Sequence, residues 1–248
     1  FGRVPSIIEE NGFEYKLLKK LLSITDTIVV IDEKSYQALR NLHYQNIVYF
    51  PNPISNSFLQ EAEKQKDLTI RKSKTAIFVG HVVPTKGVTE LVEGCCNVSG
   101  LSLKIVGKCS NEMRERLYSL AQKRENGYWL NMVGEIPHKE VIKEMLQAET
   151  FIFPSYTEAF PNVILEAMVC GCAIASSDVG AIPEMLDYNG ETVGVCFKPE
   201  SAEEVTNAIN TLYKDDTHRI QLAEKAKEKV YNTYTMEKVW AQITNLWK

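Results

Sequence analysis

The sequence lacks several patterns that would place it in a familiar class of cofactor-binding or metal-dependent enzyme. It has no GxGxxG fingerprint, which argues against an enzyme that binds NAD or FAD. The segment around Lys86 is not a P-loop, because Thr85 precedes this lysine and Gly87 follows it. It has no Asp-x-Asp pair to hold a metal–diphosphate, and no histidine has a metal partner four residues further on. These patterns give no basis for assigning a dinucleotide cofactor or a metal.

Other absences concern cysteine pairs, long apolar runs and charge. No apolar run reaches the roughly 18 residues of a membrane-spanning helix, and we expect no signal peptide. The net charge of -4 gives no reason to expect nucleic acid or a strongly acidic membrane as a partner. No CxxC pair and no zinc-like spacing occurs among the cysteines, so we expect reduced, structural thiols in a cytosolic protein. The six cysteines are Cys95, Cys96, Cys109, Cys170, Cys172 and Cys196.

What the sequence contains in abundance is a regular alternation of apolar runs and helical patterns from residue 75 onward. The repeat has the length of βαβ units, and the apolar runs are apolar throughout, as in strands that are covered on both faces. The sequence therefore predicts an α/β fold with a doubly wound parallel sheet. The expected strands are 75–80, 101–107, 128–134, 150–154, 173–176 and 192–197, and the expected helices are 86–97, 111–125, 138–147, 163–169, 182–186 and 202–213.

The segments on either side of this repeat have different patterns. An amphipathic helix at 6–22, strands at 27–31 and 47–50 and a helix at 33–42 predict that residues 1–56 are the end of a larger α/β domain. Residues 57–73 are polar and predict a surface linker or helical hinge before the main domain at 74–234. The tail at 235–248 is expected to be a helix, capped by Thr235, that packs back toward the first domain. Its apolar stripe is Val239, Trp240, Ile243, Leu246 and Trp247.

Two glutamates flank the predicted turn from the strand at 150–154 into the next helix. Glu158 lies in the loop, and Glu166 lies about one turn inside the helix. A helix N-terminus offers free N–H groups and is a ready anion site, and Pro161 is tolerated there. Two acids around such a site suit a ligand with phosphate and many hydroxyls. An ordinary helix start, with acids favoured by the macrodipole, is the alternative.

Further candidates lie where other predicted strands end, at the edge where parallel sheets bind ligands. Gly80, Gly107 and Gly134 each let the backbone approach a ligand closely, although Gly107 alone favours a simple turn. His81 follows Gly80. Lys86 is predicted to open a helix, where a cation is disfavoured unless an anion joins it, so it is a candidate for phosphate binding.

The loop that follows Gly134 has apolar and backbone groups that suit a nucleobase. Its His138 is interpreted as the first residue of a helix rather than as a catalyst. The small-residue loop at 176–184 is either a plain turn or part of the same site, with equal weight.

Taken in order, these segments resemble the C-terminal domain of the retaining GT-B glycosyltransferases of family 4, or glycosyltransferase group 1. The resemblance covers about residues 25–248 and includes the family's pair of glutamates with seven residues between them, Glu158 and Glu166. It also includes VGEIP at 133–137, KIVG at 104–107, EAFPN at 158–162 and SSDVGAIPE at 176–184. It implies a Rossmann-like domain with a partial second α/β domain at residues 1–56.

The resemblance implies a transfer of sugar from a nucleotide-diphosphate donor with retention of configuration, and without a metal or cofactor. Lys86 would neutralise the diphosphate, Glu158 would bind the donor sugar, and Glu166 would hold the ribose hydroxyls. Phe160, Pro161 and Asn162 would present backbone N–H groups to the sugar and phosphate. Ile136 would border the base, beside the remaining donor-site positions Gly80, His81, Gly107 and Gly134. His81 departs from the basic residue of many relatives.

The implied partners are a nucleotide-sugar donor and a glycan or lipid-linked acceptor, in the cytoplasm or at the cytoplasmic face of a membrane. Since the acceptor domain of this family lies on the N-terminal side, we expect donor binding rather than full turnover from residues 1–248. Two other readings stay open: a non-catalytic nucleotide-sugar-binding module, and another GT-B enzyme such as a sugar-nucleotide epimerase. A phosphorylase would need a pyridoxal lysine, for which the sequence gives no sign.

Overall fold

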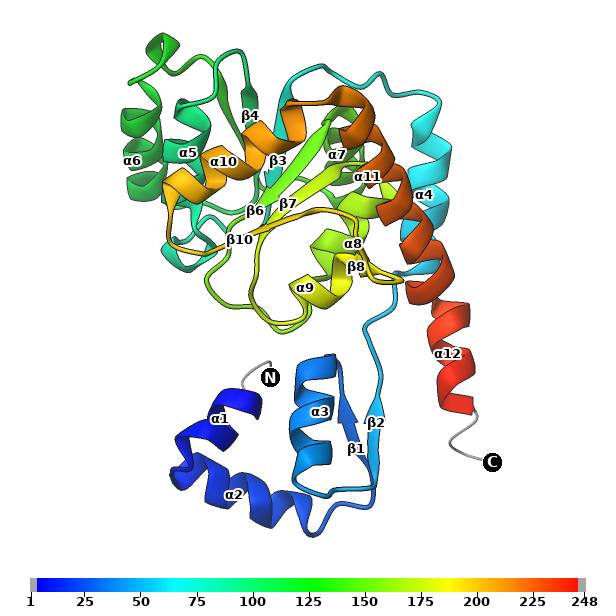
Figure 1. Ribbon diagram of the computed structural model, residues 1–248. Coiled ribbons are helices and arrows are strands. Elements are labelled where there is room, and N and C mark those ends of the chain that lie inside the picture. The colour runs from blue at the N-terminus through cyan, green and yellow to red at the C-terminus, as the bar shows by residue number, and fades with distance from the viewer. Residues whose placement is uncertain (1–3, 245–248) are drawn as a thin grey trace.

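A six-stranded parallel sheet forms the centre of the larger part of the chain (Figure 1). The computed structural model describes residues 4–244. The order of the strands across the sheet is β10-β7-β6-β3-β4-β5, and all neighbours are parallel. The strands are β3 (Thr75–Val79), β4 (Ser102–Val106), β5 (Leu130–Gly134), β6 (Thr150–Phe153), β7 (Ala173–Ser177) and β10 (Val195–Phe197). The predicted doubly wound parallel sheet is confirmed.

Helices cover both faces of this sheet, which is why its strands are apolar along their whole length. On one face α5, α6 and α10 pack together, and on the other face α4 and α11 pack against α7 and α8 (Figure 1). Their bounds are α4 (Asn56–Lys66), α5 (Val88–Cys96), α6 (Asn111–Ala121), α7 (His138–Gln147), α8 (Asn162–Val169), α9 (Ile182–Met185), α10 (Ala202–Tyr213) and α11 (Asp216–Lys229).

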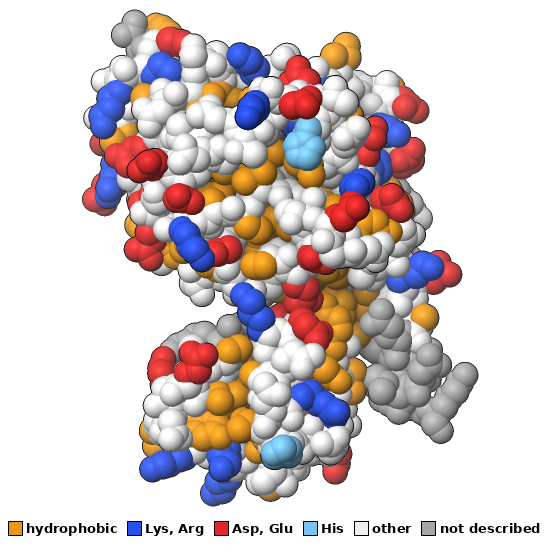
Figure 2. All heavy atoms as spheres, viewed as in Figure 1, with side chains coloured by type: hydrophobic (Ala, Val, Ile, Leu, Met, Phe, Trp, Pro, Cys, Tyr) orange, Lys and Arg blue, Asp and Glu red, His pale blue; other side chains and the backbone are white. Residues whose placement is uncertain are grey.

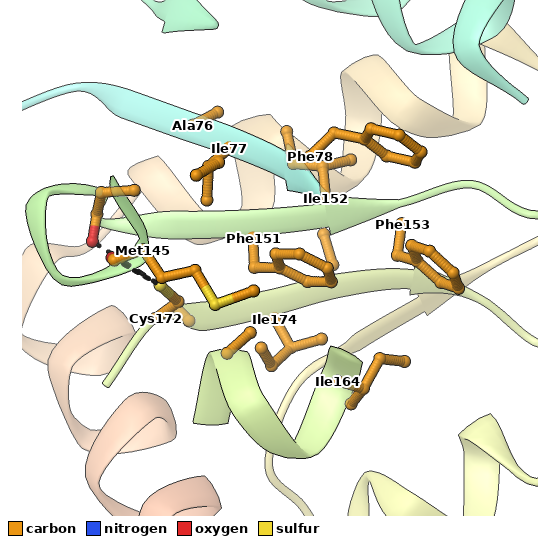
Figure 3. Packing of buried hydrophobic residues seen from close by; sticks show 14 of the residues in the cluster. Ala76, Ile77, Phe78, Met145, Phe151, Ile152, Phe153, Ile164, Cys172 and Ile174 are labelled. Atoms are coloured by element: carbon orange, nitrogen blue, oxygen red, sulfur yellow. Dashed lines mark hydrogen bonds between the residues drawn. The ribbon is translucent and has the colours of Figure 1, made fainter. Parts of the chain in front are cut away.

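The core between the sheet and its helices is built from large apolar side chains (Figure 3). Phe78, Phe151 and Phe153 stack along neighbouring strands, with ring centroids 5.9 and 5.8 Å apart for the two contacting pairs. The thiol of Cys172 donates to the Met145 carbonyl at 3.3 Å in the same layer. All six cysteines are free thiols, as predicted.

Glycine and asparagine explain two places where predicted elements are divided. The helix predicted at 6–22 is two helices, α1 (Val4–Glu10) and α2 (Phe13–Leu22), because Asn11 adopts a left-handed conformation before Gly12. The strand predicted at 192–197 is also wrong. Its first residues form a hairpin from β8 (Asp187–Tyr188) and β9 (Glu191–Thr192), and β10 begins only after Gly194.

A small lobe contains α1, α2, β1 (Ile28–Val30), α3 (Glu33–Asn41) and β2 (Ile47–Tyr49), as Figure 1 shows in dark blue. Its two strands are parallel and its core is a separate cluster of Ile28, Val30, Leu39 and Ile47. One extended segment joins this lobe to the large body. Figure 2 shows acidic and basic side chains mixed over the visible face of both parts.

The segment between the two parts is fixed at its large-body end. Ser55 caps α4 by accepting from the Phe58 N–H, and Phe58 is buried in the main core. Residues 57–73, interpreted above as a linker or helical hinge, are therefore mostly the helix α4. The Ile54 N–H donates to the Tyr234 carbonyl at 2.7 Å, which ties the segment to the tail of the chain.

The tail consists of α11, a π-helical turn (Val230–Tyr234) and α12 (Met236–Thr244). Thr235 caps α12 as predicted, since its hydroxyl accepts from the Lys238 N–H at 3.3 Å. In the expected apolar stripe Val239 is fully buried and Trp240 is about half exposed. The side chain of Ile243, and Leu246 and Trp247, lie outside what the structure describes. Over residues 4–244, no helix is long and apolar enough to cross a membrane.

Candidate functional site

The topology of the sheet places one crevice ahead of all others as a ligand site. From β3 the chain moves outward to β4 and β5, then returns to β6 on the other side of β3 and continues to β7. The loops that leave β3 and β6 therefore diverge, and in open α/β sheets ligands bind at this reversal of strand order. Lys86 follows β3 and Glu158 follows β6. Two residues 72 positions apart in sequence thus face the same crevice.

Lys86 and Glu158 form an ion pair across this crevice. Their side chains are 26% and 13% exposed, so the pair is shielded from water without being sealed off from it. The backbone joins the same two loops, because the Tyr156 N–H donates to the Thr85 carbonyl at 2.9 Å. The Lys86 Nζ also lies 5.6 Å from the centre of the Phe153 ring. The lysine is held from three sides at the switch point of the sheet.

The predicted position of Lys86 at the start of a helix is wrong. Pro84–Lys86 form a single 3-10 turn, and α5 begins at Val88 after Gly87 has turned into the left-handed conformation. The ammonium group consequently points away from the first turn of α5, and its negative partner is the side chain of Glu158.

The turn that leads from Glu158 into α8 is largely buried. The Phe160 ring packs edge-on against Tyr234, with centroids 5.7 Å apart, so its side chain anchors the turn. Pro161 is the N-cap residue of α8 and has no N–H, so the expectation that it donates one is wrong. Asn162 is the first helical residue and is exposed. The N–H groups that this helix end offers to an anion belong to Asn162 and the residues after it.

Gly180, in the loop after β7, holds the backbone of the same turn. Its φ is +55°, and a Cβ at this position would lie 2.1 Å from the Glu158 carbonyl oxygen. The next residue, Ala181, donates its N–H to the Ala159 carbonyl at 2.9 Å. The sequence analysis did not select Gly180, although its place in a loop of small residues was a signal for close packing.

Glu166 lies one turn inside α8, beside His138 at the start of α7. The Nε2 of His138 is 3.2 Å from the Oε1 of Glu166. Burial raises the pKa of the Glu166 carboxyl above its usual value, while His138 acts in the opposite direction. The imidazole also rests against Phe58 of α4, with ring centroids 5.5 Å apart. His138 begins a helix as predicted, but its contact with Glu166 was missed.

A pocket of about 220 Å³ lies at the ends of β3, β4 and β5. Four predicted residues line it: Gly80, His81, Gly107 and Ile136. Gly134 is adjacent, since its carbonyl accepts from the Gly107 N–H at 2.8 Å. The pocket wall also includes Lys108, Glu135 and Val141, which the sequence analysis did not select. Lys108 directly follows a glycine that ends a strand, which was the available signal.

The preference for a simple turn glycine at Gly107 needs revision. A Cβ there would lie 1.9 Å from the Gly80 carbonyl oxygen, so the two strand ends touch at this point. The narrow wall of the pocket depends on that contact. Among residues 4–244, no three His, Cys, Asp or Glu side chains gather in a way that could hold a metal ion.

The arrangement combines a cation, a helix N-terminus, two carboxylates and a small pocket along one edge of a parallel sheet. Comparison with known proteins gives the family. The family described as "Glycosyl transferases group 1" matches residues 60–229, which is more than half of the chain. The chain belongs to this family. The resemblance inferred from the sequence is therefore confirmed at the level of glycosyltransferase group 1.

Curated relatives of this glycosyltransferase are similar over most of its length. A putative teichuronic acid biosynthesis glycosyltransferase, TuaC of Bacillus subtilis, is 25% identical over 223 residues, which is 87% of this chain and 54% of TuaC. One subunit of the human phosphatidylinositol N-acetylglucosaminyltransferase is 28% identical over 271 residues, which is 96% of this chain and 51% of that protein. The chain thus spans about half the length of the curated relatives it matches.

Solved structures agree on the fold of this glycosyltransferase. Sucrose-phosphate synthase from Thermosynechococcus elongatus matches with a TM-score of 0.78 and 23% identity, over 94% of this chain and 60% of that one. HepE from Anabaena, solved in complex with UDP, matches with a TM-score of 0.76 and 16% identity, over 90% of this chain and 64% of that one. These neighbours are GT-B glycosyltransferases, and the predicted GT-B fold class is confirmed.

Proposed function

We propose that this chain binds the nucleotide-diphosphate sugar in a retaining, metal-independent transfer to a glycan or lipid-linked acceptor. The observation that carries this proposal is the convergence of Lys86, Glu158 and the N-terminus of α8 at the reversal of strand order. A sugar-nucleotide donor reacts by losing its nucleoside diphosphate, which gains negative charge as the glycosidic bond breaks. Preorganised cations and N–H groups at that position stabilise the charge that develops.

Each residue has a separate part in this proposal. Lys86 neutralises the leaving diphosphate, which the N–H groups of α8 also bind. Glu158 accepts hydrogen bonds from hydroxyls of the donor sugar, and Glu166 does the same for the ribose. The pocket with Gly80, His81, Gly107, Gly134 and Ile136 takes the nucleobase side of the donor. Phe160 fixes the turn, and the N–H groups of Asn162 and the next residues face the phosphates.

The names of relatives support the two ends of the proposed reaction. HepE was solved with UDP, which supports a nucleotide donor. The names of the two curated relatives refer to teichuronic acid and to phosphatidylinositol, which supports a glycan or a lipid-linked acceptor. We place the reaction in the cytoplasm, at a membrane face where the acceptor is lipid-linked.

Calorimetry with UDP, GDP and ADP tests the donor site. At least one of these nucleotides should bind, and Lys86→Ala should weaken its binding by about tenfold or more, since a charge-assisted contact is lost. Binding of the matching nucleoside should change little. The control is Lys225→Ala, which removes another lysine paired with a glutamate, Glu191, far from this crevice in the fold.

Two results would overturn the proposal. One is that none of the three nucleotides binds. The other is that Lys86→Ala weakens nucleoside and nucleotide equally, because the lysine would then not act on phosphate. Metal independence is tested separately: affinity for the nucleotide diphosphate, measured after treatment with EDTA, should be unchanged.

A further inference from the structure

A second, larger cavity lies at the opposite edge of the same sheet. Its volume is about 430 Å³, and it is bounded by the end of α4, the loop that follows, the C-terminus of α8 and the outer part of α11. The floor is apolar or weakly polar, with Leu146, Cys170 and Ala223 buried. A cavity of this size and lining falls in the range of small-molecule sites. No part of the proposed donor site lines it.

The wall of this cavity has an excess of positive charge. Lys66, Arg71 and Lys227 line it, against the single carboxylate of Glu224. Burial lowers the pKa of the Lys227 ammonium, and the charges of Lys66 and Arg71 act in the same direction, while Glu63 and Cys170 oppose them. Over residues 4–244, neither Lys66 nor Lys227 has a carboxylate within ion-pair distance.

Arg71 is fixed in this wall by the end of α8. Its guanidinium donates to the carbonyls of Cys170, at 2.6 Å, and of Gly171. These carbonyls carry the negative end of the helix, so Arg71 is held as a cation at a set position. The cavity is therefore preorganised on one side and has two longer, freer lysines on the other.

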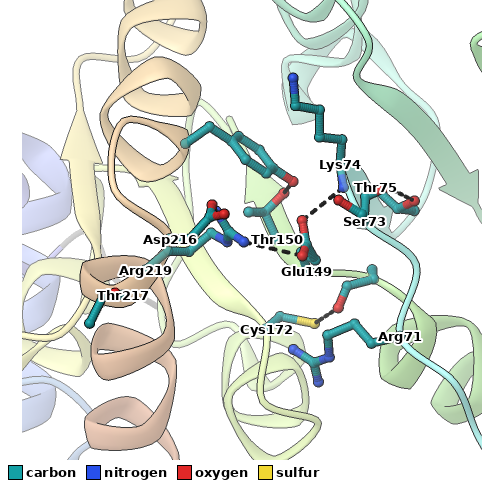
Figure 4. A network of polar contacts seen from close by, with 12 residues as sticks. Arg71, Ser73, Lys74, Thr75, Glu149, Thr150, Cys172, Asp216, Thr217 and Arg219 are labelled. Atoms are coloured by element: carbon teal, nitrogen blue, oxygen red, sulfur yellow. Dashed lines mark hydrogen bonds and ion pairs between the residues drawn. The ribbon is translucent and has the colours of Figure 1, made fainter.

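A neighbouring acid is already engaged elsewhere (Figure 4). Glu149 accepts from Arg219 at 3.1 Å and from the Lys74 N–H at 2.8 Å, which joins the starts of β3 and β6 to α11. Arg219 also pairs with Asp216. This network satisfies its own charges and leaves the cations of the cavity without that carboxylate.

We propose that this cavity binds a small organic phosphate, with its phosphate group between Lys66, Arg71 and Lys227 and its carbon body on the apolar floor. Three cations suit a doubly charged phosphate better than a single carboxylate. The apolar floor favours a phosphate ester over the free ion. A hollow of this size holds a molecule in solution rather than the surface of a bilayer.

The site is tested with phenyl phosphate and inorganic phosphate as probes, followed by heteronuclear NMR on the full chain. Phenyl phosphate should shift the Gly171 amide signal in a saturable way, and more tightly than inorganic phosphate. In Lys66→Met/Lys227→Met the affinity should fall by about tenfold or more. Lys227→Arg keeps the charge and should keep the binding.

Lys86→Met separates this site from the proposed donor site, which also attracts phosphate. Binding followed at Gly171 should be unchanged in this variant, whatever the nucleotide calorimetry shows. The proposal is overturned if Gly171 shows no saturable shift, if the double variant binds as tightly as the original chain, or if Lys86→Met alone abolishes the shift. Both substituted lysines lie at the surface, and Lys66→Met alone should weaken binding if the double variant does not fold.

Discussion

At the scale of single residues, the Lys86–Glu158 pair joins two tasks in one crevice. The lysine provides charge for a diphosphate, and the glutamate partly neutralises that charge. A partly shielded pair of this kind is worth less than a sealed one, so either partner can turn to a ligand. The proposed division of roles makes opposite predictions for the two residues.

Glu158→Gln should leave UDP binding intact or strengthen it by about two- to fivefold, because it removes a negative charge beside the diphosphate. The same variant should abolish sugar transfer by the complete enzyme and weaken the preference for a nucleotide sugar over the free nucleotide. Calorimetry with UDP and with the corresponding nucleotide sugar measures both effects. A loss of UDP binding as large as that of Lys86→Ala would contradict the assignment of Glu158 to the sugar.

The contact between His138 and Glu166 predicts a pH effect. Burial raises the pKa of Glu166 and His138 counteracts this, so His138→Ala should raise that pKa further. The carboxylate accepts ribose hydroxyls best when ionised, so the fall of nucleoside affinity in acid should begin at a higher pH in the variant. Calorimetry across pH 4 to 8 measures this limb. An unchanged acid limb would show that His138 does not act through Glu166.

The linked effect on stability has a defined sign. A carboxyl whose folded-state pKa is raised holds its proton in the folded chain at pH values where the unfolded chain has released it. The contribution of Glu166 to stability is therefore complete below its unfolded pKa, and it is lost as the pH rises through the raised folded pKa. In the proposed function this cost is offset by ribose hydroxyls that hydrogen-bond to the ionised group.

At the scale of elements, the strands and helices of the large body followed from apolar patterning, while their ends depended on single residues. The break at Asn11–Gly12 and the hairpin before β10 arise from positive-φ turns that periodicity does not detect. The crevice with Lys86 and Glu158 followed from the rule that parallel strands end at one edge. The contacts of His138 and Gly180 could not, because they depend on how separate loops pack together.

Gly180→Ala tests whether the loop after β7 shapes the glutamate turn. The added Cβ would overlap the Glu158 carbonyl at a positive φ, so we expect a loss of roughly 2–4 kcal/mol in stability and weaker nucleotide-sugar binding. Gly190→Ala is the matched control, because Gly190 also has a positive φ but an added Cβ would meet nothing within 4 Å. Its cost should be about 1–2 kcal/mol, with unchanged binding.

Denaturant unfolding and calorimetry compare the two glycine variants. Equal losses of stability in both would mean that only backbone strain matters. Unchanged ligand binding in a folded Gly180→Ala variant would separate this loop from the site.

At the scale of the whole molecule, Glu184 connects the large body to the small lobe. Its carboxylate accepts from the Tyr49 hydroxyl and from the Glu33 N–H, at 2.7 Å for the latter. Lys229 donates to the Glu184 carbonyl at 2.5 Å and so places this residue from the other side. Burial raises the pKa of Glu184, while the two bonds from the small lobe act in the opposite direction.

Tyr49→Phe should loosen the small lobe, because a buried carboxylate loses a donor at a cost of about 1–3 kcal/mol. Hydrogen exchange should become faster in β1 and β2 at pH 8, and the effect should fade in acid, where Glu184 is protonated. Tyr188→Phe is the control, since Tyr188 bonds to Glu228 within the large body. Faster exchange in both variants, or in neither, would rule out Glu184 as the connection.

The central claim is that a nucleotide diphosphate binds where the strand order reverses. A crystal structure of the chain with UDP tests it most directly. We predict that the diphosphate lies between Lys86 and the N-terminus of α8, with the ribose at Glu166 and the base at Ile136. Density for the nucleotide at the opposite edge of the sheet, or at the reversal point without contact to Lys86, would contradict the account.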